Sequence, residues 1–482
     1  MNEKISRNKI FSGLMWKFAE RILAQGVSLI VSIVLARILL PEDYGTVSMV
    51  MVFITIANVF VSNGFSTALI QNKDCTDSDY STMFYCSVVV SIVVYFIIFL
   101  LSPLVENFYG LTNLGLVLRV LAIKLPISAV NSIQHAYVSR NMLFKRFFWS
   151  TLIGTLVSGI VGIIMAIQGF GVWALVTQYL VNSIMDTVVL FFTTEWKPKL
   201  LFSLNAAKKL MNYGWRITIA ELISTVYSQL RSLVIGKKYS SSDLAYYNKG
   251  DSFPALLANN INSSISTVLF PALANVQSNP YVIKKMTRQS IKVCAYTIFP
   301  LMCGLAAVAN NFVSVVLTDK WLPCVPFLRM SCINYALMAI GTANLQALKG
   351  MGRSDIYLKM EVIKKTVGII LLLISMNFGV IAIAVGGVIV TIICELVNIY
   401  PNVECLSYGY KEQLFDLLPA TFCSAVMWLV VWGVGELISD PLITLSVQIP
   451  IGFLVYLMCS VIFNRKTSAY MFDIIKRVRI KG

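Results

Sequence analysis

Basic side chains occur inside long apolar segments of this sequence, where a charged group is costly unless it faces water, a ligand or a partner. The six that are candidates for binding a ligand are Lys17, Arg21, Arg216, Arg231, Lys249 and Arg329. Arginine binds phosphate through paired N–H donors, and lysine binds it as a point charge. Because basic residues outnumber acidic residues in these segments, we predict a cationic cavity for an anionic ligand. The alternative for any single residue is that it reaches an interface or neutralises a nearby acid.

Uncharged polar residues accompany the basic ones at helical spacing. Lys17, Arg21 and Gln25 recur every four residues and therefore share one helix face. A later segment repeats this pattern between Arg216 and Arg231. Helices with such faces are tolerated in a membrane where they line water. The residues expected to line the cavity are Gln25, Ser28, Asn58, Asn63, Asn259 and Asn262.

Acidic residues also occur within the apolar segments, and four of them are candidates for coupling transport to H⁺ or Na⁺. These are Asp186, Glu221, Asp251 and Glu395. The alternative is charge neutralisation, as expected for Glu361 with Lys364 on one helix face. No other cofactor is expected. With a single histidine, His135, and ten scattered cysteines, the sequence predicts no metal site, and we expect a structural role for His135.

The elements that position these residues are membrane-spanning helices. The chain has 482 residues, of which 57% are hydrophobic and 13% charged, whereas a soluble domain carries roughly 25% charged residues. The mean hydropathy is +0.76. Long apolar runs without alternation favour helices over a barrel. The sequence predicts an all-α membrane protein with about 14 spans, at 11–40, 46–70, 80–105, 114–138, 147–168, 171–194, 213–235, 244–271, 288–312, 325–348, 356–376, 379–400, 414–435 and 441–463.

The net charge is +16, and the positions of the basic residues along the chain indicate the membrane topology. Most basic residues fall in alternate loops and the tail, which are cytoplasmic by the positive-inside rule, and few fall in the loops between them. This distribution predicts cytoplasmic N- and C-termini in a bacterial inner membrane, contact with anionic lipids, and no nucleic-acid partner. The basic tail after 470 is expected to form an amphipathic helix on the membrane or, alternatively, to remain solvated.

An internal repeat at an offset of 200 organises the chain. Asp43 aligns with Asp243, and Ser66 with Ser266. Since each copy holds six spans, both copies should have the same orientation, related by a twofold pseudo-axis along the membrane normal. We therefore predict a first lobe over 1–194, an amphipathic cytoplasmic linker over 195–212, and a second lobe over 213–400. Two further spans and the tail occupy 401–482.

Three stretches carry a resemblance to a known family. The sequences WKFAER at 16–21, LARILLPEDYG at 35–45 and GFSTALIQ at 64–71 resemble the first half of bacterial Wzx-type, and more closely WzxC-like, polysaccharide flippases of the MOP superfamily. Residues 246–248 and 269–274 are similar to the second half. The resemblance implies two six-helix lobes, alternating access, and a cationic lumen for an undecaprenyl-diphosphate-linked oligosaccharide. Arg21, Arg37 and Arg216 match the family pattern, whereas Lys237 replaces an arginine.

These observations predict a transporter that moves a lipid-linked glycan to the outer leaflet for O-antigen, capsule or exopolysaccharide export. The expected partners are this substrate, membrane lipids and the polysaccharide polymerase machinery, with the protein acting as a monomer. One alternative is an ion-coupled drug or small-molecule antiporter of the same superfamily, which should have an acid-rich cavity. The other is a membrane glycan polymerase or ligase, which would need a large outer loop.

Overall fold

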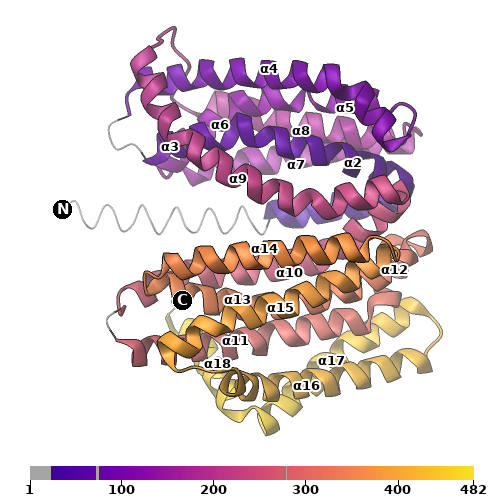
Figure 1. The fold of residues 1–482 in the computed structure, drawn as a ribbon. Helices are drawn as coiled ribbons and strands as arrows, with labels where there is room; N and C mark the ends of the chain where they lie inside the picture. The colour runs from indigo at the N-terminus through magenta and orange to yellow at the C-terminus, as the bar shows by residue number, and fades with distance from the viewer. Residues whose placement is uncertain (1–22, 72–74, 278, 482) are drawn as a thin grey trace. The chain divides into compact units, whose positions relative to one another are not determined.

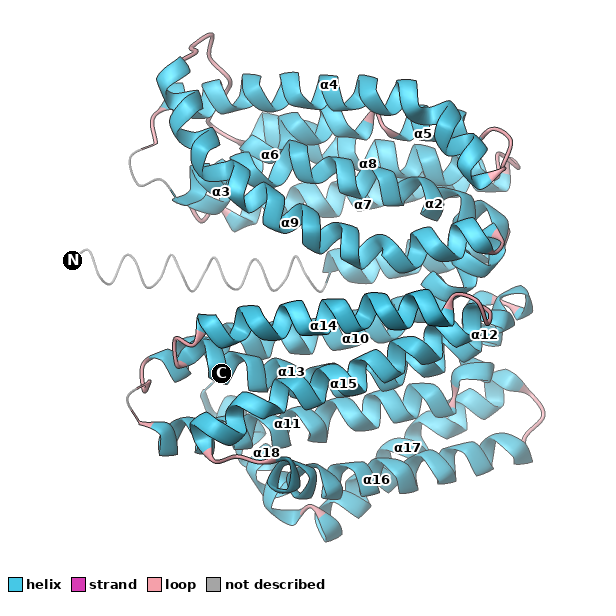
Figure 2. Cartoon of the chain, in the orientation of Figure 1, coloured by secondary structure: helices cyan, strands magenta, loops and turns pink. Residues whose placement is uncertain are grey.

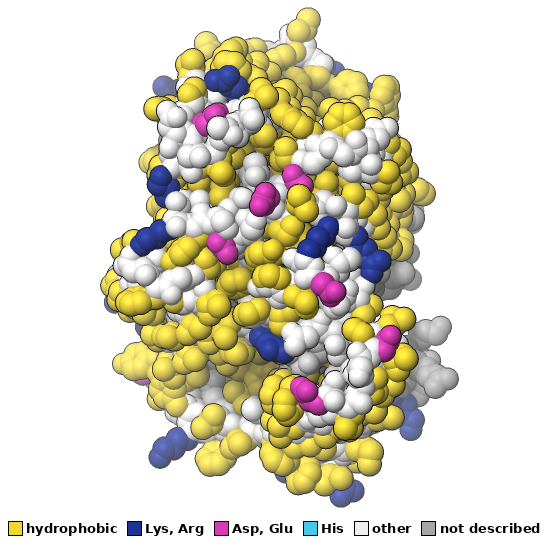
Figure 3. All heavy atoms as spheres, turned by 90° about the vertical axis from the view of Figure 1, so that its right-hand side faces the viewer, with side chains coloured by type: hydrophobic (Ala, Val, Ile, Leu, Met, Phe, Trp, Pro, Cys, Tyr) yellow, Lys and Arg dark blue, Asp and Glu magenta, His cyan; other side chains and the backbone are white. Residues whose placement is uncertain are grey.

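Helices build the whole of the described structure. The computed structural model describes residues 23–71, 75–277 and 279–481, and every regular element within these ranges is helical (Figure 2). Within these described ranges, ten helices are long and apolar enough to cross a membrane. Large apolar side chains such as Phe192, Phe378 and Leu454 are exposed, and hydrophobic groups cover much of the face in Figure 3. The chain is therefore a multi-pass membrane protein.

The chain forms two compact units, Met1–Ala245 and Tyr246–Gly482. The first described helix, Leu23–Ile38, precedes the labelled helices of Figure 1. The first unit continues with α2 (Pro41–Asn58), a π-helical turn η1 (Val59–Asn63), α3 (Gly64–Gln71), α4 (Asp77–Tyr109), α5 (Leu114–Leu121), α6 (Lys124–Arg140), α7 (Phe144–Ile167), α8 (Val172–Thr193) and α9 (Leu204–Lys238).

Close helix pairing holds the first unit together. Helices α7 and α8 form an antiparallel hairpin, whose loop contains Gly171 with a φ of +53°. A Cβ at Gly154 would lie 3.4 Å from a backbone oxygen of α8, so a glycine there permits the close approach. Helix α9 packs on α2, α3 and α4. Leu69, Met83 and Trp196 belong to one buried cluster beneath these helices.

The second unit begins within the long helix α10 (Ser241–Ala274). It continues with α11 (Pro280–Ala307), α12 (Ala309–Leu317), a 3-10 turn η2 (Asp319–Cys324), α13 (Val325–Gly350), α14 (Ser354–Ser375), α15 (Val380–Leu406), α16 (Tyr410–Leu437), α17 (Pro441–Phe463) and α18 (Arg465–Lys481). Helix α11 packs against both α13 and α16, and α13 packs against α15 (Figure 1).

A buried amide network joins three helices of the second unit. Asn344 Nδ2 on α13 donates to Gln413 Oε1 on α16 at 3.0 Å. Asn402 Nδ2 on α15 donates to Asn344 Oδ1, also at 3.0 Å. All three side chains are buried. Hydrogen bonding of these groups to each other avoids the cost of leaving amides unpaired in an apolar interior, and it fixes the relative rotation of the helices.

The helices α2 and α10 begin in the same way. The backbone N–H of Leu40 donates to Asp43 Oδ2 at 3.1 Å, and the backbone N–H of Ser240 donates to Asp243 Oδ2 at 3.1 Å. In each case a carboxylate three residues into the helix satisfies a donor at its N-terminus. The two acids thus perform the same local task at positions separated by the repeat offset.

The helices depart from the predicted organisation in several places. The second span is interrupted by η1 at Val59–Asn63, the fourth is divided between α5 and α6, and the ninth is divided between α11 and α12. Residues 195–203 are not helical, and 204–212 form the start of α9 rather than a separate surface helix. Since α9 packs on α2 to α4, the compact units divide after Ala245. The proposed lobe boundary near 212 stays a prediction about the repeat.

Candidate functional site

Two of the basic residues predicted to bind the ligand, Arg216 and Arg231, lie on α9. Arg216 is exposed, with its guanidinium carbon 5.9 Å from the ring centre of Trp215. Arg231 is partly exposed and Glu221 is exposed. The opposite side of α9 contacts α2, α3 and α4. Helix α9 therefore presents a mixed polar face away from the packing of its own unit, as its residue spacing predicts.

The remaining predicted cavity residues of this unit lie on its first helices. Lys17 and Arg21 fall outside the described residues. Gln25 is partly buried and Ser28 is exposed on the helix Leu23–Ile38. Asn58 ends α2, and its buried side-chain oxygen has no hydrogen-bond partner.

The π-helical turn that follows α2 adds a polar bond inside the membrane-spanning region. The Ser62 hydroxyl donates to the Asn58 carbonyl at 2.8 Å, and Asn63 closes the turn. Such turns often occur at functional sites. This turn therefore places Asn58 and Asn63 at an irregular point of the span.

Helix α10 carries the predicted polar residues of the second unit. Lys249 is buried beneath Trp321, with Nζ 5.6 Å from the ring centre. Asp251 accepts hydrogen bonds from Ser331 Oγ at 2.7 Å and from Tyr335 Oη at 3.1 Å. Both of these partners belong to α13, so Asp251 lies at the contact between the two helices.

Two asparagines further along α10 differ in burial. Asn259 is exposed, whereas Asn262 is buried and neither of its side-chain polar atoms has a hydrogen-bond partner. A buried amide without partners is destabilising unless it meets water or a ligand. Asn262 is therefore the asparagine of α10 whose surroundings most favour a binding role.

Arg329 is held differently from the other basic residues. Its Nε on α13 donates to the backbone carbonyl of Ala306, near the end of α11, at 3.3 Å. This bond joins two helices of the second unit. The structure brings Arg329 to a helix contact rather than to the polar surroundings of Lys249 and Asp251.

Two predicted ion-coupling acids lie in clusters on the second helix of a hairpin. Asp186 on α8 accepts from Asn131 Nδ2 at 2.5 Å and lies 3.2 Å from His135 Nε2. Glu395 on α15 lies 3.5 Å from the Nδ2 donor of Asn398. The sequence did not predict that Asn131 and His135 would contact Asp186, or that Asn398 would contact Glu395. The available signal was that these residues share a polar helix face with other polar residues.

On α14, an acid and a basic residue neutralise each other, as the alternative to an ion-coupling role predicts. Lys364 Nζ lies 2.5 Å from Glu361 Oε1, three residues away, and donates to Asn398 Oδ1 at 3.2 Å. Lys364 is thus bonded both within its helix and to α15. The predicted pairing of Glu361 with Lys364 is confirmed.

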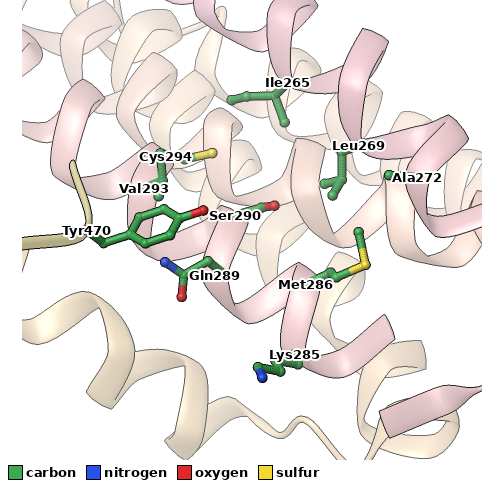
Figure 4. Close-up of a pocket in the computed structure, with 10 residues that line it drawn as sticks. All are labelled: Ile265, Leu269, Ala272, Lys285, Met286, Gln289, Ser290, Val293, Cys294 and Tyr470. Atoms are coloured by element: carbon green, nitrogen blue, oxygen red, sulfur yellow. The ribbon is translucent and has the colours of Figure 1, made fainter. Parts of the chain in front are cut away.

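One cavity of about 560 Å³ lies within the second unit, between α10 and α11 and next to α18 (Figure 4). Its lining is mainly apolar, with polar groups from Lys285, Gln289, Ser290 and Tyr470. None of the ten residues drawn in Figure 4 is among the predicted binding residues. The cavity therefore adds no support to the predicted cationic site.

Comparison with known protein families shows to which family the chain belongs. The family model described as "Polysaccharide biosynthesis protein" matches residues 34–326, which is more than half of the chain. The chain belongs to this family. Seven of the predicted site residues lie on α9 and α10 and fall inside the matched region, namely Arg216, Glu221, Arg231, Lys249, Asp251, Asn259 and Asn262.

Individual relatives agree with the family assignment. The chain is 25% identical over 446 residues to the lipopolysaccharide biosynthesis protein WzxC of Escherichia coli, covering 90% of this chain and 89% of that protein. It is 19% identical over 356 residues to the succinoglycan biosynthesis transport protein ExoT of Rhizobium meliloti, covering 74% and 72%. The resemblance to WzxC-like proteins predicted from the sequence is confirmed.

The fold of the chain also has a solved counterpart. The lipid II flippase MurJ, in an inward closed conformation, matches with a TM-score of 0.77 at 18% identity, covering 95% of this chain and 99% of that one. At this level of identity the likeness establishes a shared fold. The helical membrane architecture predicted from the sequence is therefore confirmed.

Proposed function

We propose that this protein is a flippase for lipid-linked oligosaccharides. It moves an undecaprenyl-diphosphate-linked glycan repeat unit from the cytoplasmic to the outer leaflet for surface polysaccharide export. The observation that carries the proposal is the match to WzxC along nearly the whole length of both chains. The transport protein ExoT and the MurJ fold add support. The proposal makes the protein a transporter rather than an enzyme.

In the proposed mechanism, basic side chains offset the charge of the diphosphate. Arg216, Arg231 and Lys249 supply this charge on α9 and α10, together with Lys17 and Arg21, while Arg329 acts as a more distant cation. Uncharged polar residues contact sugar hydroxyls. A membrane potential that is negative inside favours outward movement of an anion by about 2.3 kcal/mol per charge per 100 mV. The lipid tail remains in the bilayer as alternating access exposes the head group.

The proposed architecture has fourteen spans in two six-helix lobes plus two C-terminal spans. Three long helices outside the ten apolar ones could supply further spans, with 35 residues in α9, 34 in α10 and 22 in α14. The matching caps made by Asp43 and Asp243 support the parallel repeat. The domain limits in this proposal are 1–194, 195–212, 213–400 and 401–482.

The proposed setting is the bacterial inner membrane, with both termini in the cytoplasm. There the protein acts as a monomer beside the polysaccharide polymerase machinery, takes no organic cofactor, and couples transport to H⁺ or Na⁺. The distribution of basic residues supports the orientation. The helical conformation of α18, with Lys476 exposed, supports a tail that lies on anionic lipid.

Reconstituted transport tests this function directly. The protein is placed in proteoliposomes with an undecaprenyl-diphosphate-linked oligosaccharide, and translocation is scored by access of an external glycan-cleaving enzyme. We expect protein-dependent translocation, reduced at least about tenfold by Arg21→Ala combined with Arg216→Ala, since each charged hydrogen bond contributes about 1.5–3 kcal/mol. A control variant, Arg353→Ala combined with Arg465→Ala, removes two exposed arginines outside the spans and should retain the wild-type rate.

Two outcomes would contradict the proposal in different ways. Equal translocation by the double variant and the control would exclude the phosphate site at Arg21 and Arg216 but keep the flippase. Folded wild type that moves none of several lipid-linked glycans would exclude the flippase. Drug efflux by that same preparation would then favour the antiporter of the same superfamily.

A further inference from the structure

The histidine of this sequence contacts an acid between two spans of the first unit. His135 Nε2 on α6 lies 3.2 Å from Asp186 Oδ2 on α8. Asn131, one turn earlier on α6, donates from Nδ2 to the same oxygen at 2.5 Å. Both helices belong to candidate membrane spans. An imidazole and a carboxylate therefore share a hydrogen-bonded cluster where charge is costly.

The two members of this pair differ in their exposure. The side chain of Asp186 is 19% exposed and that of His135 is 41% exposed. The imidazole stacks on Phe147 of α7, with ring centres 4.7 Å apart. Asp186 Oδ1 and Asn131 Oδ1 are both buried without a hydrogen-bond partner. The carboxylate is thus enclosed, while the imidazole has an open edge through which a proton can arrive.

We propose that His135 and Asp186 together bind one proton that is exchanged for substrate in each transport cycle. The inference rests on the proposed flippase function, and it assigns the coupling ion and its site. With Nε2–H donating to Asp186 Oδ2, the lone pair on Nδ1 accepts a proton from a hydronium ion, which departs as water. One N–H bond forms, one O–H bond breaks, and the charge of the pair changes from −1 to zero.

This change of charge links proton binding to conformation. A net negative charge in a span needs water or a counter-charge, whereas an ion pair with good hydrogen bonds carries no net charge into the low-dielectric interior. The protonated pair can therefore remain in the membrane interior when the site is closed to water. The deprotonated pair requires access to water, so the proton is taken up where the site opens to one side and is released where it opens to the other.

The neighbouring charged groups have other partners or lie near helix ends. On α7, Arg146 binds Glu195 at 2.7 Å and Lys145 lies in the first turn. On α6, Arg140 binds Tyr80 of α4 at 3.4 Å, and Lys124 lies over Tyr179 of α8. Arg119 on α5, a helix that packs against α8, donates to Ser102 of α4 at 2.5 Å. Asp77 and Asp79 lie in the first turn of α4, Glu106 lies near its end, and Glu42 and Asp43 lie in the first turn of α2. The remaining ionisable side chains on the packed helices are Tyr44, Tyr85, Cys86, Tyr95, Tyr109 and Tyr137. Helix α3 and η1 carry no ionisable side chain.

Other membrane acids have surroundings that fit a proton site less well. Asp416 lies against Arg288 and Lys292, which keep it charged and in place. Asp251 accepts from two hydroxyl groups. Histidine is the side chain whose charge ordinarily changes between pH 5 and 8, and His135 is the single histidine of the sequence.

A transport assay with an imposed pH gradient tests the proposal. Flipping in proteoliposomes is measured with and without acidification of the compartment that receives the glycan. For one coupled proton, the wild-type rate should rise by up to about tenfold per unit of gradient. The ratio should fall to one for Asp186→Asn and for His135→Gln. The control Asn182→Ala removes an amide on α8 that donates to Ser158 of α7, and this variant should respond like the wild type.

The outcomes separate the two proposals. Gradient stimulation that survives in both pair variants overturns the proton site, as does stimulation by Na⁺ alone or loss of the response only in Glu395→Gln. Absence of all flipping by folded wild type overturns the flippase function instead.

A second measurement is independent of transport. Selective ¹⁵N labelling of histidine in the full chain reports His135 alone. Its ring signals should change when the pair takes up a proton, and the change should differ in Asp186→Asn. Ring signals that ignore pH, or that respond identically in both proteins, overturn the proposal whatever the residual activity of the variants.

Discussion

At the residue scale, the acids within the spans differ in what surrounds the carboxylate. Asp416 lies against two basic side chains, and an acid held this way acts as a clamp because the charges cancel. Asp251 has hydroxyl donors, and Asp186 has an amide and an imidazole. Among these acids, Asp186 is the one whose partner includes an imidazole that can itself take up a proton, which suits it to proton exchange. The partners therefore separate structural acids from candidate coupling acids better than position along the helix does.

Removal of the Asp416 carboxylate should destabilise the second unit. It lies 2.5 Å from Arg288 Nε and 3.0 Å from Lys292 Nζ, and accepts from Tyr408 Oη at 3.0 Å. Asp416→Ala leaves these donors facing an apolar side chain. We expect a loss of about 2 kcal/mol, below the value for fully buried pairs because both basic side chains are partly exposed. The midpoint of thermal unfolding of the purified protein measures this loss.

An exposed acid on the same helix provides the control for that variant. Glu436 lies near the end of α16 and is exposed, so Glu436→Ala should leave the midpoint within experimental error. Equal midpoints for the Asp416 and Glu436 variants would show that the Asp416 cluster adds nothing to stability.

At the element scale, hydropathy located the helices but not their interruptions or rotations. The span predicted at 441–463 coincides with α17, and the one at 325–348 nearly coincides with α13. The π-helical turn after Asn58 was missed because a change of hydrogen-bond register leaves hydrophobicity unchanged. The bond between Asn131 and Asp186 was missed because it depends on how two distant helices rotate against each other. Lys17 and Arg21 stay predictions from helical spacing.

Close packing of α13 and α15 depends on a glycine beside an acid. A Cβ at Gly341 would overlap the carboxylate of Glu395, coming within 2.6 Å of Cδ. We expect Gly341→Ala to destabilise the protein by about 1–3 kcal/mol, because the helices must separate or Glu395 must move. The midpoint of thermal unfolding again measures the effect. Combining it with Glu395→Ala, which vacates the space, should restore part of the loss.

A second glycine shows whether the effect comes from this contact. A Cβ at Gly433 on α16 would meet nothing within 4 Å, so Gly433→Ala should be neutral or slightly stabilising. If the Gly341 and Gly433 variants unfold at the same temperature, the contact with Glu395 does not limit the packing of α13 against α15.

At the scale of the whole molecule, the predicted repeat has a second pair of similar contacts besides the caps of α2 and α10. In the first unit, Ser66 Oγ on α3 donates to the carbonyl of Ser132 on α6 at 3.0 Å. In the second, Gln346 Nε2 on α13 donates to Ser266 Oγ on α10 at 3.1 Å. Ser66 and Ser266 are separated by the repeat offset, and each joins the second helix of its copy to the fourth. These equivalent contacts support copies that run in the same direction through the membrane.

Cysteine labelling distinguishes parallel from inverted copies. In a background without the native cysteines, Asn141→Cys and Ser354→Cys place a thiol in the loop or first turn after α6 and α13, which are equivalent in the repeat. Gln168→Cys and Asn377→Cys do the same in the loops after α7 and α14. With an impermeant thiol reagent on intact cells, we expect labelling at 168 and 377 and protection at 141 and 354, because basic residues flank the protected pair.

Membrane permeabilisation supplies the control, since all four positions should then react. If 141 and 354 were labelled from opposite sides, the number of spans between them would be odd and the copies would be inverted. An inverted repeat would place the polar faces of the helix Leu23–Ile38 and α9 at opposite orientations. The predicted cationic cavity, which needs Arg21 and Arg216 at similar depth, would then be excluded. Labelling of both members of each pair from the same side keeps the two arginines at matching depth and supports a common phosphate site.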